Sequence, residues 1–164
     1  MGVVALSVNT KSNRFLEIMR WVFVAIGIFF AFYWGNNNPQ TQFSIFAIFS
    51  VIFLAGFTAI EGIFFSEGGA EVAGYGGDGG SWRRQSRMHF LALTVTMILA
   101  WLLNWGFFAY VGIYMVLLLF FTFSAINHFY TGLKEKFVMN TLLRPVLTIF
   151  LWIVTLYFLL PALK

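Results

Sequence analysis

The longest apolar stretch of this chain runs from Phe107 to Thr131 and reads FFAYVGIYMVLLLFFTFSAINHFYT. It contains no Asp, Glu, Lys or Arg. A helix rises 1.5 Å per residue, so a stretch of this length can cross the roughly 30 Å of hydrocarbon in a bilayer. Because lipid offers no partner to backbone N–H and C=O groups, the stretch predicts a transmembrane helix.

The composition of the whole chain agrees with a membrane protein. Hydrophobic residues make up 60% of the 164 residues and charged residues only 10%, whereas a soluble domain has roughly 25% charged residues. Such a chain cannot cover a water-facing surface, so residues 1–164 are predicted to form a single integral membrane domain. Since the chain has no cysteine, it can form neither a disulfide framework nor a thiolate site.

Further apolar segments flank the central one and predict an all-α fold, a polytopic transmembrane helical bundle. Five spans are predicted, at about 15–34, 43–65, 88–104, 107–131 and 142–161. A glycine-rich loop at 66–87 separates the second span from the third. The third span is short, and only Asn104–Gly106 separates it from the fourth. Four spans, with residues 104–113 as a re-entrant turn, is therefore the alternative.

Positive charge predicts how the spans are oriented. With five spans, nine of the ten Lys and Arg residues fall on or near one side: Lys11, Arg14, Arg20, Arg83, Arg84, Arg87, Lys134, Lys136 and Arg144. Only Lys164 falls on the other side. By the positive-inside rule, the N-terminus and the loop 66–87 are cytoplasmic in a multi-pass protein of the plasma membrane, which is the inner membrane of a bacterium. This topology accounts for the net charge of +4 without a nucleic-acid partner.

Polar residues inside the spans gather toward the predicted cytoplasmic side. The candidate polar pocket consists of Glu61, Ser124, Asn127, His128 and Arg144. The three from the fourth span recur at helical spacing and so share one face. Charges in a membrane cost roughly 2.5–3.5 kcal/mol each at a helix centre and less near the ends, so they are expected to face inward and pair.

Specific pairings follow from this expectation. Glu61 is predicted to pair with Arg144 or His128, and Glu17 with Arg20 on the same helix. In a structural interpretation, these groups join the helix ends and reach toward the interface. In a functional interpretation, they line a pocket that opens to the cytoplasm. The sequence leaves both interpretations open.

The function predicted from these features is that of a non-enzymatic membrane component. Its polar cluster would bind a small amphiphile or support a membrane complex. One alternative is a small oligomeric transporter or channel. Another is a lipid- or quinone-modifying enzyme that uses Glu61 and His128 as acid and base, so the question of enzymatic activity stays open.

No catalytic, cofactor-binding or metal-binding residues are assigned. The only two histidines, His89 and His128, lie on different spans and lack the spacing of metal ligands. As partners the sequence predicts the lipid bilayer and allows a homo-oligomer or a larger membrane complex. Neither a cofactor nor a nucleic acid is expected.

The order of several short motifs resembles a family of small prokaryotic integral membrane proteins of unknown function, from the second span onward. The motifs are Glu61-Gly62, Arg84-Gln85-Ser86, Asn127-His128-Phe129-Tyr130 and Asn140. The resemblance implies a polytopic helical fold and no particular activity. The family pattern has acidic residues at or near Ser124 and Arg144 and a glycine at Asn127, so it implies no carboxylate chemistry at these positions here. The chain also has a looser similarity to four-helix membrane proteins of the DoxX type.

Overall fold

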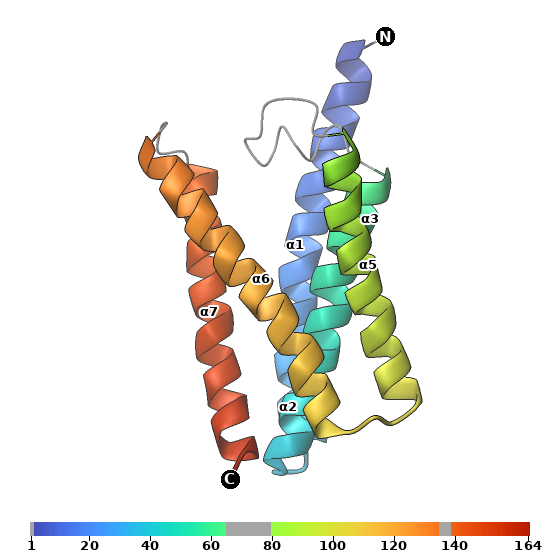
Figure 1. Cartoon of the computed structure of the whole chain (residues 1–164), viewed down its shortest axis with the longest axis vertical. Helices are drawn as coiled ribbons and strands as arrows, with labels where there is room; N and C mark the ends of the chain where they lie inside the picture. The colour runs from blue at the N-terminus through green and yellow to red at the C-terminus, as the bar shows by residue number, and fades with distance from the viewer. Residues whose placement is uncertain (1, 65–79, 135–138) are drawn as a thin grey trace.

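The structure, a computed structural model, describes the backbone of residues 2–64, 80–134 and 139–164. All regular structure in these residues is helical, which confirms the predicted all-α bundle. In chain order the elements are α1 (Gly2–Trp34), α2 (Pro39–Ser50), the π-helical segment η1 (Val51–Ala55), α3 (Gly56–Phe64), α5 (Gly80–Leu102), α6 (Phe107–Lys134) and α7 (Met139–Ala162). Because α2, η1 and α3 form one continuous rod, the described chain crosses the bundle five times, and its N- and C-termini lie at opposite ends (Figure 1).

The apolar parts of these helices match the predicted spans. Four are long and apolar enough to cross a membrane: Phe15–Trp34, Pro39–Phe64, Phe107–Tyr130 and Leu143–Ala162. The chain is thus a multi-pass membrane protein. In α5 the apolar part is shorter, Arg87–Leu102, but the helix packs antiparallel against α3 within the bundle (Figure 1). The four-span alternative stays a prediction, because residues 107–113 form the first turns of α6 and four of the described helices are long and apolar enough to cross a membrane.

One predicted boundary needs correction. The third helix begins at Gly80 and not at residue 88, so the last part of the predicted loop 66–87 is helical. No glycine or proline occurs between Ser81 and Arg87, and so no helix breaker interrupts that stretch. The first fourteen residues of the loop, 66–79, lie outside the described residues.

The turn between α1 and α2 is set by its own side chains. Asn36 and Asn37 have φ angles of 47° and 57°, in the left-handed region that asparagine tolerates better than most residues. The Asn38 side chain then accepts a hydrogen bond from the backbone N–H of Thr41 at 3.1 Å, and Pro39 occupies the first position of α2. Both features are typical helix starts, so the reversal is encoded locally.

The core lies where α2 meets the last two helices. Phe46 is fully buried, and its ring lies 5.4 Å from the rings of both Tyr114 on α6 and Phe158 on α7. Along the rod that contains it, α2 contacts α1, α6 and α7 and touches α5 to a smaller extent, whereas α3 contacts α1 and α5. The π-helical segment η1 lies between these two sets of contacts. A π-helical turn contains more residues than an α-helical turn, so it rotates the side chains of the helix that follows it. This rotation agrees with the different neighbouring helices of α2 and α3.

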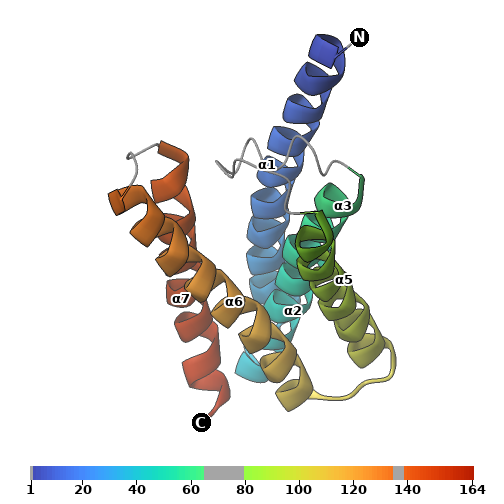
Figure 2. The ribbon, with the colours of Figure 1, turned by 45° about the horizontal axis from the view of Figure 1, so that its top comes forward.

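The helices separate toward one end of the bundle. In Figures 1 and 2, α6 and α7 diverge from α1, α3 and α5 toward the end where α3 and α6 finish. Among the described residues, no Cα atom of α6 or α7 lies within 8 Å of α1 or α3. We call this end the charged end, because Arg20, Glu61, Arg87, His128 and Arg144 lie toward it.

Candidate polar site at the charged end

The first polar contact at the charged end joins α1 to α3. Arg20 Nη2 donates to Glu61 Oε2 in an ion pair, and also to the backbone carbonyl of Phe57 at 3.4 Å. The two charged side chains are only 15% and 20% exposed. The rings of Phe23 on α1 and Phe53 on η1 stack with centroids 4.0 Å apart, so aromatic packing joins α1 to the segment that precedes α3.

A second arginine reaches the same helix from its other side. Arg87 Nη1, on α5, donates to the Gly62 carbonyl at 2.7 Å. Carbonyls in the last turn of a helix lack intrahelical partners, and basic side chains there are favourable. A Cβ atom at Gly62 would lie 2.2 Å from Arg87 Cδ, so the glycine makes room for the arginine. The last turn of α3 is therefore held by arginines from both neighbouring helices.

The third contact joins α6 to α7 and involves a histidine. Arg144 Nη1 lies 2.7 Å from His128 Nε2. An arginine can only donate, so Nε2 accepts, and the imidazole in this contact is neutral with its proton on Nδ1. The His128 side chain is 4% exposed. In this contact a buried neutral ring receives a hydrogen bond from a charged guanidinium group.

Two more polar contacts continue along the α6–α7 interface toward the core. Trp152 Nε1 donates to Thr122 Oγ1 at 2.9 Å. Closer to the opposite end, the hydroxyls of Tyr114 and Thr155 lie 2.6 Å apart. Thr155 Oγ1 also lies 2.6 Å from the Leu151 carbonyl and donates to it; since a hydroxyl has one proton, Tyr114 is the donor to Thr155. Hydrogen bonds thus hold α6 to α7 at three levels.

The predicted pairings are wrong. Glu61 pairs with Arg20 and not with Arg144 or His128, and Glu17 has no ion pair in the described part of the chain. The reason is the helix arrangement: α1 lies beside α3, while Arg144 lies on α7, which contacts α6 and not α3. Depth alone could not have identified the partner of Glu61, because Arg20, His128 and Arg144 all lie toward the same end of the bundle.

The other two residues of the candidate pocket lie on α6 near His128. Ser124 is half-buried and Asn127 is exposed. The structure therefore brings His128 and Arg144 together, leaves Ser124 and Asn127 on the same helix, and places Glu61 in a separate pair. A common pocket for all five residues stays a prediction.

The geometry also bears on chemistry. Glu61 and His128 bind different arginines and lie on helices that do not contact each other, so they do not form the acid–base pair that the enzyme alternative needs. Within the described residues, no three His, Asp or Glu side chains come close enough to hold a metal ion.

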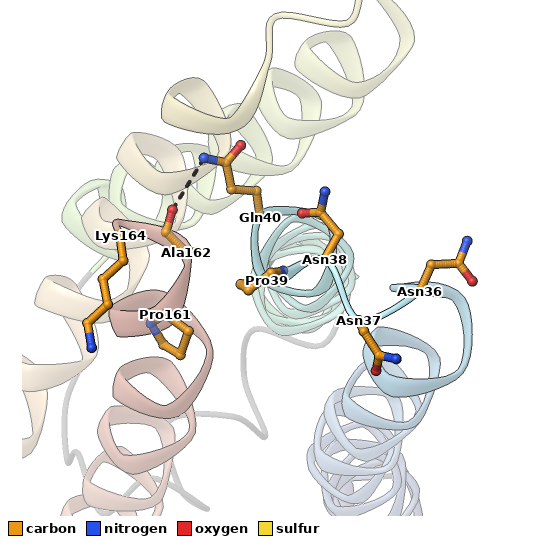
Figure 3. A pocket seen from close by; sticks show the side chains of 8 residues that line it. All are labelled: Asn36, Asn37, Asn38, Pro39, Gln40, Pro161, Ala162 and Lys164. Carbon is orange, nitrogen blue, oxygen red and sulfur yellow. Dashed lines mark hydrogen bonds between the residues drawn. The ribbon is translucent and has the colours of Figure 1, made fainter.

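A hollow of about 410 Å³ lies at the opposite end of the bundle, which the sequence did not indicate. Figure 3 shows it between the α1–α2 turn and the end of α7, where Gln40 Nε2 donates to the Ala162 carbonyl at 3.3 Å. It is lined by Asn36, Asn37, Asn38, Pro39, Gln40, Pro161, Ala162 and Lys164. Its lining is mostly uncharged, and it is distant from the ion pair and from His128.

The charged end thus carries two separate polar pairs on diverging helices, one with balanced charge and one without a carboxylate. The predicted resemblances to the prokaryotic family of unknown function and to the DoxX type stay predictions. Comparison with protein-family models, with curated proteins and with solved structures finds no match to this chain.

Proposed function

We propose that this protein is a non-enzymatic component of the cell membrane that binds a small amphiphile at its charged end. The observation that supports this most is the exposed apolar surface of α6 near that end, where Phe123, Ile126 and Phe129 are all exposed. An acyl chain can bind to such a surface within a bilayer, and α6 and α7 diverge there from α1 and α3 (Figure 2). Polar side chains at the same level, Asn127 among them, would meet the head group.

The polar pairs support the same proposal. Each pair closes a contact within its own group of helices, Arg20 with Glu61 between α1 and α3 and His128 with Arg144 between α6 and α7. Neither of these two pairs joins one group of helices to the other. A partner protein of a membrane complex could occupy the same place, and a labelling experiment distinguishes such a protein from an amphiphile.

We expect a photoreactive phosphatidylcholine, with a diazirine on its acyl chain, to label the protein at a saturable site. Adducts should map by peptide mass spectrometry to residues 120–130 of α6 and to the facing part of α1 or α3. Labelling at this site should saturate at a few lipids per protein, because a bound amphiphile occupies a limited number of positions.

The control is the Thr41→Leu variant, which changes an exposed polar side chain at the opposite end, compared with Asn127→Leu at the charged end. Asn127→Leu should weaken saturable labelling several-fold and Thr41→Leu should not. Adducts spread over all lipid-facing helices and rising linearly with lipid would contradict the proposal. A second protein crosslinked at residues 120–130 would favour the membrane-complex alternative.

We further propose that the charged end faces the cytoplasm, as the distribution of Lys and Arg predicts. A fusion of alkaline phosphatase after Lys164 should then be active, and a fusion of green fluorescent protein there should be dark. The same pair of reporters inserted in the loop 66–79 should give the reverse result. A fluorescent fusion after Lys164 would invert the orientation and move the polar pairs to the outer face.

A further inference from the structure

At the charged end, Arg144 is not paired with any acidic side chain among the described residues. The described acidic side chains are Glu17 on α1 and Glu61 on α3, and Glu61 is paired with Arg20. The partner of Arg144 is His128, whose Nε2 accepts and therefore contributes no charge. In the described part of the chain the positive charge of Arg144 is left unbalanced.

The remaining donors of Arg144 are accessible. Its Nη1 is taken by His128, while Nε and Nη2 have no hydrogen-bond partner among the described residues and are not buried. A guanidinium fork presents several N–H groups in fixed geometry and matches carboxylate and phosphate oxygens well. Because His128 is buried and holds one arm of the fork, the other arm is oriented before any ligand arrives.

Arg144 lies near the charged end of its helix. It is five residues after Met139, where the described part of α7 begins. A long basic side chain near the end of a transmembrane helix can extend its charged group to the level of the bilayer head groups.

We infer that Arg144, oriented by His128, binds the anionic head group of an amphiphile, either the phosphate of an anionic phospholipid or the carboxylate of a fatty acid. This inference rests on the proposed function and adds the charge of the ligand to it. Arg144 would supply charge and directed N–H donors, and His128 would position it.

The test is a lipid titration of the purified full-length protein in detergent, followed by native mass spectrometry. The probes are dioleoyl phosphatidylglycerol, oleate and, as the net-neutral reference, dioleoyl phosphatidylcholine. We expect the wild type to bind phosphatidylglycerol, oleate or both about five- to tenfold more tightly than phosphatidylcholine, as one cation at a membrane surface predicts. A preference for only one of the two identifies the head group as phosphate or carboxylate.

Two charge-removing variants locate this preference. Arg144→Gln should bind all three probes with equal affinity, and Lys164→Gln, which removes an exposed cation at the opposite end, should keep the wild-type preference. A preference that survives in Arg144→Gln overturns the inference. If the wild type binds all three probes equally but saturably, the inference fails and the proposed function stands; if no probe saturates, the proposed function fails as well.

Folding of Arg144→Gln need not limit the test. A diazirine-bearing phosphatidylglycerol crosslinked to the wild type should label residues 143–148 of α7 at saturation. Labels confined to other helices would overturn the inference without the use of any variant. His128→Phe, which keeps a ring but removes the acceptor, should lower the preference for the anionic probes several-fold and leave phosphatidylcholine binding unchanged, as expected for a positioning residue.

Discussion

The Glu61→Gln variant is expected to unfold in detergent at a lower temperature than the wild type, because the change leaves the Arg20 guanidinium without its carboxylate. Removing one partner of a buried ion pair costs about 3–5 kcal/mol in soluble proteins. Both side chains here keep some exposure, and interhelical hydrogen bonds in membranes average about 0.6 kcal/mol, so we expect a loss of about 1–2 kcal/mol. For a chain of this size that lowers the midpoint by about 2–8 °C.

A matched control lies on the same helix as Arg20. Glu17 is half-buried and has no ion pair in the described residues, so Glu17→Gln should change the midpoint little. The double variant of Glu61→Gln with Arg20→Gln should recover part of the loss, with a coupling of at least about 0.5 kcal/mol. Equal losses for Glu17→Gln and Glu61→Gln would show that the ion pair does not stabilise the α1–α3 contact.

The fold could be predicted from the sequence because two simple signals determine it. Apolar stretches long enough to cross a bilayer predict helices, and the segregation of Lys and Arg predicts an odd number of crossings. Both signals can be read along the sequence without knowing which helices contact each other. The helices at 107–134 and 139–162 agree with the predicted spans within a few residues. The start of α5 was missed because Trp82–Arg87 is polar, and polarity alone does not distinguish a helix that leaves the membrane from a loop.

The pairing of polar groups could not be predicted in the same way. Glu17 and Arg20 have the i,i+3 spacing of a helical ion pair, yet Arg20 reaches across to Glu61. The choice depends on which helix lies beside α1 and how it is rotated, and an apolar helix surface rich in Phe and Leu carries little information on rotation. The candidate residues His128 and Arg144 were both identified, but their contact with each other requires the position of α7 against α6.

Close helix contacts give the other large expected effect, at Gly27. A Cβ atom added there would lie 2.6 Å from Phe49 Cβ on α2, a separation that real Cβ atoms essentially never show. Phe49 cannot easily yield, because its ring lies 5.4 Å from that of Phe30 and 5.8 Å from that of Phe53. Gly27→Ala should therefore push α1 away from α2 and lower stability by about 1–3 kcal/mol, as overpacking does elsewhere.

Two other helical glycines turn this prediction into a graded series measured by thermal unfolding in detergent. At Gly56 an added Cβ would meet Thr94 Cγ2 at 3.5 Å, an ordinary contact, and at Gly112 it would meet nothing within 4 Å. Alanine favours a helix over glycine by about 1 kcal/mol in water, so Gly112→Ala should be neutral or stabilising and Gly56→Ala should fall between the two. All three changes add the same methyl group to a helix. Only the distance to the neighbouring helix differs, and a Gly27→Ala variant as stable as Gly112→Ala would mean that α1 does not pack on α2 as closely as described.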